Sequence, residues 1–185
     1  MLNVDTLGIV ESKSIAAGVD LADGMMKTAD VELVRASTIC SGRYLIIIAG
    51  DRDAVQTSVG YARESGRVLF GSYVISNVSE QVLNALKRGT PAEEGCAISI
   101  VECRRVSAGV AAADVAVKHS AVSLVRIVTG QGINGKSYFI MSGDVASVEE
   151  ATEAAKAALG QQLVEAVVIP RPNASVLRTL TSGVR

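Results

Sequence analysis

The sequence predicts an α+β protein built from two similar units in tandem. The first observation behind this prediction is an internal repeat. "GIVESKSIAAGVDLADGMMKTADVELVRAST", from Gly8, aligns with "SIVECRRVSAGVAAADVAVKHSAVSLVRIVT", from Ser99, at a constant offset of 91 residues. The second is a later match, in which "SYVISNVSEQVLNAL", from Ser72, aligns with "AVVIPRPNASVLRTL", from Ala166. The third is that β-rich and helical patterns alternate within each copy.

The repeat also predicts the domain boundaries, because self-similarity at a fixed offset marks two copies of one structural unit. We expect a first domain over residues 1–90 and a second over residues 95–185. The segment "KRGTPAEEG" between them is rich in Pro, Gly and Glu, which is typical of a linker. We therefore place the linker at about residues 87–95.

The elements of the first copy follow from its periodicity. Strands are predicted at 6–12, 31–39, 44–49 and 68–76, and helices at 15–29 and 52–65, followed by a short helix. Asp51 is expected to cap the helix from residue 52, and Gly66 lies just beyond its end. The same order recurs in the second copy. It predicts a ferredoxin-like unit whose helices cover one face of a sheet.

Composition argues against several classes of partner. The net charge is −1, and the chain has two Phe, four Tyr and no Trp, so little is available to bind or stack on nucleic acid. The apolar run "YLIIIAG" is too short to cross a bilayer. The N-terminus has no basic region followed by an apolar segment, which argues against secretion. Three cysteines at irregular spacing favour a reducing cytoplasm over a disulfide scaffold.

The motif "GQGINGKS" at 130–137 fits the pattern of a phosphate-binding loop, G-x-x-x-x-G-K-[ST]. Such a loop must follow a strand and lead into a helix, whose N-terminal N–H groups hold the phosphates. Here Ser137 runs into "YFIMSG", which aligns by repeat with the strand "LIIIAG". The sequence therefore predicts a Gly-rich hairpin, and a nucleotide hydrolase is not expected.

Both copies resemble a known family. "GIVESKSIAAGVDLADGMMKTADVEL", the Gly-bearing hairpin, "AGD" and "VIPRP" at 168–172 are similar to the bacterial microcompartment shell domain. Two such domains in one chain, without circular permutation, resemble the tandem-domain class of shell proteins. The resemblance implies a homotrimer that imitates a hexamer and tiles with other shell proteins. It also implies a structural, non-enzymatic role in a compartment shell within the cytoplasm.

The resemblance assigns roles to three charged residues. Lys27 and Lys118 match the lysine that forms contacts between neighbouring tiles, and Arg171, in "IPRP", matches the arginine beside it. The first copy has Asn77 at the position of Arg171. The alternative is a solvated lysine at a helix end, where the helix dipole favours a positive charge.

The hairpin loops at 38–43 and 129–137 match the family's pore loops, which meet around the central axis of the assembly. The implied pore residues are Thr38, Ile39, Cys40, Ser41, Gly42, Gly130, Gln131, Gly132, Ile133, Asn134 and Gly135. Glycines there permit close approach of the backbone.

Cys40 stands at the turn of the first pore hairpin, so a trimer would bring three thiols to one axis. "STICSGRY" is similar to the pore segment of a tandem-domain subgroup from propanediol-utilisation microcompartments, which reads Thr-Ile-Cys-Pro-Gly-Lys. Ser41 replaces the proline and Arg43 the lysine. That subgroup is described as holding an iron–sulfur cluster through this cysteine. The resemblance implies one [4Fe–4S] cluster per trimer, held by Cys40 of three chains.

The implied function is electron transport across the shell, with a redox enzyme inside the compartment or in the cytosol as a partner. Three alternatives remain: an electron carrier for which the shell is only a location, zinc on the same three thiols, and a bare thiol ring. With bare thiols the protein would be a plain shell tile with a metabolite-conducting central pore. Cys96 and Cys103 are expected to be packing residues. Glu11 and Glu102, equivalent in the two copies, are expected to make repeated structural contacts.

Overall fold

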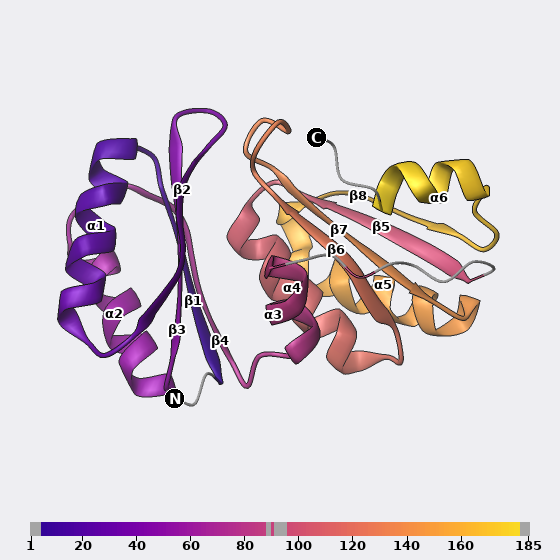
Figure 1. Cartoon of the computed structure of the whole chain (residues 1–185), viewed down its shortest axis with the longest axis horizontal. Coiled ribbons are helices and arrows are strands. Elements are labelled where there is room, and N and C mark those ends of the chain that lie inside the picture. Colours follow the sequence, from indigo (N-terminus) through magenta and orange to yellow (C-terminus); the bar gives the residue numbers. More distant parts are fainter. Residues whose placement is uncertain (1–4, 88–89, 91–95, 182–185) are drawn as a thin grey trace. The chain divides into compact units, whose positions relative to one another are not determined.

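The computed structural model describes residues 5–87, 90 and 96–181, and Figure 1 shows its two sheets with their helices. The chain divides into two compact units. The first comprises 1–78 together with 105–107 and 130–135, and the second comprises 79–104, 108–129 and 136–185. Most of the predicted linker at 87–95 lies outside the described residues.

The first repeat folds in the predicted order. Its elements are β1 (Thr6–Ser12), α1 (Ile15–Thr28), β2 (Glu32–Ile39), β3 (Arg43–Gly50), α2 (Arg52–Glu64), β4 (Leu69–Ser76) and α3 (Glu80–Lys87). The second repeat follows the same order. Its elements are β5 (Ala97–Cys103), α4 (Val106–His119), β6 (Ser123–Thr129), β7 (Ser137–Gly143), α5 (Val145–Leu159), the 3₁₀ turn η1 (Gly160–Gln162), β8 (Leu163–Ile169) and α6 (Ala174–Thr181).

Each repeat forms an antiparallel four-stranded sheet, with strand orders β2-β3-β1-β4 and β6-β7-β5-β8. This is the topology predicted for a ferredoxin-like unit, and the α+β prediction is confirmed. In the first unit, α1 and α2 lie against each other on one face of the sheet, as Figure 1 shows. Their apolar stripes enclose a core of aliphatic side chains that includes Leu21, Met25, Ile46, Ile48 and Val59.

The helix starts show why two equivalent positions behave differently. Asp144 caps α5, because its carboxylate accepts the Ser147 N–H at 3.0 Å. The Ser147 hydroxyl also donates to the same carboxylate at 2.6 Å and holds it in place. Asp51 occupies the N-cap position of α2, but its side chain makes no capping hydrogen bond. The repeat places Ala54 where Ser147 stands, so the second hydrogen bond that orients the carboxylate is missing.

The helix α3 is assigned to the second compact unit, although it closes the first repeat in sequence. It packs against β6 rather than contributing to the α1–α2 layer. The Ser79 N–H, just before α3, donates to the Asp114 carboxylate at 2.7 Å. The last helix of a repeat therefore need not pack on the sheet that precedes it.

Gly8 provides a stability test based on the repeat. A Cβ at Gly8 would lie 2.7 Å from Val59 and 2.8 Å from Ile48, closer than packed atoms tolerate. In the second repeat the equivalent Ser99 fits, because its hydroxyl shares a 2.7 Å hydrogen bond with Thr152, the counterpart of Val59. We expect Gly8→Ser to lower the free energy of unfolding by about 1–3 kcal/mol through overpacking and a buried unpaired hydroxyl.

Chemical denaturation followed by circular dichroism would measure this loss. The double variant Gly8→Ser/Val59→Thr recreates the pair of the second repeat and should recover part of it. Gly60→Ala serves as the control, since nothing lies within 4 Å of a Cβ there and alanine favours the helix. Equal stability of Gly8→Ser and the wild type would contradict the packing argument.

Candidate functional site at the Cys40 hairpin

Cys40 lies at the tip of the hairpin that joins β2 to β3. Ile39 pairs with Arg43, which leaves a three-residue turn of Cys40, Ser41 and Gly42. Ser41 and Gly42 both have a φ of 67°, in the left-handed region. Proline, whose ring holds φ near about −65°, cannot take the conformation of Ser41. The serine at this position therefore allows a turn that a proline would not form.

A second loop closes around Cys40 within the same compact unit. The Cys40 N–H donates to the Gly130 carbonyl at 3.2 Å, and the Gly132 N–H donates to the Cys40 Sγ at 3.1 Å. The Ser41 hydroxyl donates to Asn134 Oδ1 at 2.6 Å. The 130–135 loop and the Cys40 turn therefore form one hydrogen-bonded cluster.

The conformation of the 130–135 loop depends on its glycines. Gly130, Gly132 and Gly135 have φ between 70° and 77°. A Cβ on Gly135 would lie 2.2 Å from the Arg43 guanidinium, so the backbone comes within contact of that side chain only because glycine stands there. The motif joins the neighbouring antiparallel strands β6 and β7, which confirms that "GQGINGKS" forms a hairpin and not a phosphate-binding loop.

The backbone N–H groups around Cys40 favour its thiolate. The Gly132 N–H lowers the pKa of the Cys40 thiol below its ordinary value, with smaller contributions from the N–H groups of residues 133–135. Partial burial opposes this shift in the pKa without reversing it. The thiol is free and partly exposed. Such a thiolate is a suitable ligand for a soft metal or an iron–sulfur cluster.

A buried ion pair holds the base of the hairpin. Glu11 on β1 is fully buried, and its carboxylate accepts the N–H and hydroxyl of Ser107 at 2.7 and 2.6 Å. Arg43 Nη1 lies 3.6 Å from Glu11 Oε2, while Arg43 Nη2 donates to the Asn134 carbonyl at 3.1 Å. The same guanidinium stacks 4.0 Å from the centre of the Phe70 ring. Arg43 thus ties the Cys40 turn to the 130–135 loop.

The remaining cysteines do not share this environment. Cys103 is fully buried on β5, and burial raises the pKa of its thiol to about 12. This confirms that Cys103 is a packing residue. Cys96 is partly buried just before β5. The pKa shifts of Cys40 and Cys103 therefore have opposite directions, lowered for Cys40 and raised for Cys103.

The predicted structural role of the two glutamates is confirmed. Glu102, the counterpart of Glu11, pairs with Lys136 at 2.8 Å. Lys136 is in turn the counterpart of Arg43, so each repeat pairs an acidic residue on its first strand with a basic residue at the start of its third, Arg43 being the first residue of β3 and Lys136 the residue just before β7. The two pairs differ in exposure, since both Glu102 and Lys136 are more than a third exposed.

The BMC domain matches this chain twice, over residues 6–78 and 97–172. The chain belongs to the BMC-domain family. Both matches together cover most of the sequence, and each spans one of the four-stranded sheets described above.

Three similar proteins show how far the likeness extends. The bacterial microcompartment shell protein PduT of Citrobacter freundii is 39% identical over 180 residues, which is 96% of this chain and 98% of that protein. A microcompartment protein of Desulfitobacterium hafniense has a crystal structure that matches with a TM-score of 0.84 and 38% identity, over 95% of this chain and 99% of that one. The carboxysome shell protein CcmK2 of Thermosynechococcus vestitus is 39% identical over 70 residues, which is 38% of this chain and 69% of CcmK2.

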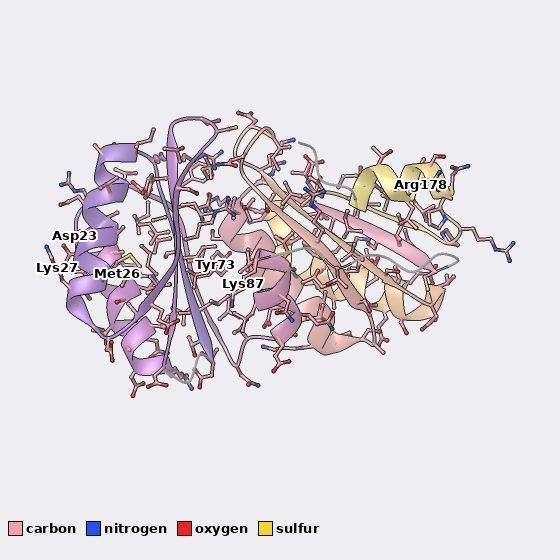
Figure 2. All side chains as sticks on the ribbon, in the orientation of Figure 1. Asp23, Met26, Lys27, Tyr73, Lys87 and Arg178 are labelled. Atoms are coloured by element: carbon pink, nitrogen blue, oxygen red, sulfur yellow. The ribbon has the colours of Figure 1, made fainter. Side chains whose placement is uncertain are left out.

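The lysines assigned to tile edges each pair with an acidic residue one helical turn earlier in their BMC domain. Lys27 pairs with Asp23 at 2.6 Å, and Figure 2 shows both on the outer side of α1. Lys118 pairs with Asp114 on α4. The pKa of Lys27 is raised, first through its hydrogen bond to Asp23. Arg171 is exposed after β8, and Asn77 at the equivalent position has a φ of 50°.

Within one chain, the described residues include no group of three or more His, Cys, Asp or Glu side chains that could hold a metal ion. Over the same described ranges, none of the helices combines the length and the apolar character needed to cross a membrane.

Sequence reasoning missed the contacts that define the Cys40 environment. It singled out Cys40 and the 130–135 loop separately, but not the bond from the Gly132 N–H to the Cys40 Sγ, which spans 92 positions. It also gave Arg43 no role beyond a basic residue in the turn. The repeat carried a signal for this contact. Glu102 stands at the position of Glu11 and Lys136 at the position of Arg43, so the same pair of opposite charges occurs in both copies.

The pKa shifts predict selective alkylation. Because the Cys40 pKa is lowered and the Cys103 pKa is raised, Cys40 should react with iodoacetamide well before Cys103 at pH 7 to 8. Its rate should reach a plateau at a lower pH than that of a model thiol. Peptide mapping by mass spectrometry, on metal-free protein over a pH series, would measure both rates.

Ser41→Pro tests the geometry behind this reactivity. Proline excludes the φ of 67° and should displace the thiol from the Gly132 N–H, so the apparent pKa of Cys40 should rise toward that of a model thiol. Ser41→Ala is the control, since it removes the hydroxyl without imposing the ring. An unchanged pH profile in Ser41→Pro would show that the backbone N–H groups do not set the reactivity.

Proposed function

We propose that this chain is a structural, non-enzymatic shell protein of a bacterial microcompartment and assembles as a homotrimer with a central pore. Three Cys40 thiolates, one per chain, would hold a single [4Fe–4S] cluster at that pore. The observation that carries the proposal is the partly exposed Cys40 thiol at a hairpin tip, with the Gly132 N–H directed at its sulfur. The likeness to PduT over nearly the whole of both chains supports the shell role.

The chemistry of the donor set fits an iron–sulfur cluster. Such clusters are held by cysteine thiolates, usually four, so three chains would leave one iron for another ligand. A lowered thiol pKa favours the form that binds iron, and hydrogen bonds to the sulfur help to set a cluster's potential. When bound, the cluster would supply one-electron transfer across the shell. The residues of this chain would hold the sulfur and close the pore around it.

The loop residues have distinct roles in this proposal. Gly132 supplies the N–H that orients the sulfur, and Arg43 fixes the 130–135 loop through the Asn134 carbonyl. Ser41 and Gly42 provide the left-handed turn that presents Cys40. Arg43 pairs with the buried Glu11, so the hairpin that carries the Cys40 thiol is fixed at its base by a buried ion pair.

The proposed partners are other shell proteins, which would tile beside this trimer in the shell of a compartment in the cytoplasm. Lys27, Lys118 and Arg171 would form contacts between neighbouring tiles. A redox enzyme, inside the compartment or in the cytosol, would exchange electrons with the cluster. The resemblance of the Cys40 loop to the pore segment from propanediol-utilisation microcompartments favours propanediol utilisation as the compartment's pathway.

Iron analysis tests the cluster. Protein purified without oxygen should contain about four irons and four acid-labile sulfides per trimer. The Cys40→Ser variant should lose both, while Cys96→Ser should retain them and report any effect of removing an unrelated thiol. Metal analysis with EPR before and after reduction by dithionite would make the measurement.

Each other outcome has a definite meaning for the cluster. Full iron and sulfide in Cys40→Ser would reject Cys40 as the ligand. Zinc in place of iron, lost in the same variant, would support Cys40 as a metal ligand but would reject electron transfer as the function of the site. Intact trimers without metal would favour a plain tile whose pore conducts a metabolite.

Charge reversal tests the tile edges. Lys27→Glu and Lys118→Glu place like charges beside Asp23 and Asp114, so we expect the extended sheets seen by negative-stain electron microscopy to be lost while the trimer persists. The control is Lys156→Glu, since Lys156 also lies in the last turn of a helix and pairs with an acidic residue, Glu153. Sheets that form equally well in all variants would contradict the edge assignment.

A further inference from the structure

Asn134 and Gly135 lie in the loop that closes on Cys40, and the structure shows why each residue stands there. Asn134 has a φ of 54°, in the left-handed region, where asparagine is one of the few residues besides glycine that are tolerated. At position 135 a Cβ would lie 2.2 Å from the Arg43 guanidinium, so glycine is required. Two separate demands of the fold therefore place an asparagine directly before a glycine.

An asparagine that is followed by glycine is chemically labile. The backbone nitrogen of the glycine can attack the side-chain Cγ of the asparagine, because the glycine has no side chain to obstruct the approach. Asn134 is the one asparagine of this sequence that precedes a glycine. It is also exposed, so water can reach it. The loop beside Cys40 therefore contains both reacting groups of succinimide formation.

Three hydrogen bonds hold the torsions that this reaction has to turn. Ring closure lies outside the left-handed conformation, so it requires rotation about the Asn134 Cα–C bond, which moves the Asn134 carbonyl and the Gly135 nitrogen together. That carbonyl accepts Arg43 Nη2 at 3.1 Å, and the Gly135 N–H donates to the Gly130 carbonyl at 3.2 Å. The side chain is held separately, because Asn134 Oδ1 accepts the Ser41 hydroxyl at 2.6 Å. The closed loop therefore restrains both reacting groups.

We propose that Asn134 is a deamidation site, which the Cys40 turn holds closed and which reacts when the loop opens. In the first step the Gly135 nitrogen gives up its proton and bonds to Asn134 Cγ, the bond from Cγ to Nδ2 breaks, and ammonia leaves. In the second step water opens the succinimide. Attack of water at Cγ yields aspartate, and attack at the backbone carbonyl carbon yields isoaspartate. Water is the only co-reactant, and nothing is oxidised or reduced.

The isoaspartate product prevents the loop from closing as before. Its main chain runs through the former side chain, which adds a methylene to the loop. The bonds to the Gly130 carbonyl and to Arg43 Nη2 then no longer fit together. Because the Gly132 N–H that faces the Cys40 sulfur belongs to the same loop, its position changes as well. The modification is therefore a lasting record that the loop beside Cys40 has opened.

Asn77 is a matched control within the same chain. It also has a positive φ, of 50°, but it is followed by Val78. The β-branched side chain of valine obstructs the approach of its backbone nitrogen to the asparagine side chain. Asn77 should therefore keep its amide under conditions in which Asn134 loses it.

Incubation of the purified protein at mildly alkaline pH tests the site. Peptide mapping by mass spectrometry would follow the replacement of the Asn134 amide by a carboxyl group, and labelling by an isoaspartyl methyltransferase would detect isoaspartate. Ser41→Ala removes the donor to Asn134 Oδ1, so deamidation should accelerate about two- to tenfold, as expected for the loss of one restraining hydrogen bond. Unfolding in guanidinium chloride should accelerate it further. Asn134→Gly keeps the left-handed backbone and has no amide to lose.

Hydrogen exchange tests the consequence for the loop. In aged protein, the peptide that spans residues 130–135 and carries isoaspartate separates chromatographically from its unmodified form. Its backbone amides should exchange faster than those of the unmodified peptide. In Asn134→Gly, aged in the same way, exchange over these residues should match that of the fresh variant.

The outcomes separate the parts of this inference. An Asn134 amide as durable as that of Asn77, in both the wild type and Ser41→Ala, would overturn the modification site. Equal rates in the wild type and Ser41→Ala would reject the restraint by the Cys40 turn, and unchanged exchange would reject the effect on the loop. The contacts lie within one chain, so the inference requires neither the trimer nor the cluster. Absence of iron in the metal analysis would leave it standing.

Discussion

The geometry at Cys40 depends on the buried ion pair between the Glu11 carboxylate and the Arg43 guanidinium. A charge that is fully removed from water must be paired and hydrogen-bonded, and losing one partner of such a pair costs about 3–5 kcal/mol. Glu11 Oε1 accepts a hydrogen bond from the Ser107 N–H, and Glu11 Oε2 lies 3.6 Å from Arg43 Nη1. Arg43 then reaches the Asn134 carbonyl and stacks on Phe70. Together with the hydrogen bonds from Cys40 to Gly130 and from Ser41 to Asn134, this buried charge positions the 130–135 loop and the N–H that faces the Cys40 sulfur.

The two repeats use the same elements for different purposes. The acid–base pair of Glu11 and Arg43 is buried, whereas its counterpart of Glu102 and Lys136 is partly exposed. Gly8 with Val59 and Ser99 with Thr152 are two solutions to one packing problem, one apolar and one hydrogen-bonded. Duplication within one chain lets each copy diverge without disturbing the fold of the other. It also allows a reactive residue to appear in one copy only.

Much of the fold followed from local pattern. The strands and helices of the first repeat were predicted to within one residue, because alternation and helical spacing are local properties. The hairpin at "GQGINGKS" was predicted correctly because the repeat aligned its exit with a strand. The prediction that the Asp51 side chain caps α2 was wrong, because Ala54 supplies no second donor to orient the carboxylate. The placement of α3 on β6 could not be foreseen, because an amphipathic pattern does not say which sheet a helix covers.

The tandem arrangement also determines how many thiols a ring of these chains would present. A ring of six identical units with a cysteine in each turn would bring six thiols to one axis, more than a cubane cluster has irons. Here the second repeat has no cysteine in its 130–135 loop, and its Gly132 N–H faces the Cys40 sulfur of the first. One repeat thus supplies the thiol and the other supplies the hydrogen bond. Divergence of the pair would adjust both the number of ligands and the environment of each sulfur, a division of roles that a single repeated domain cannot achieve.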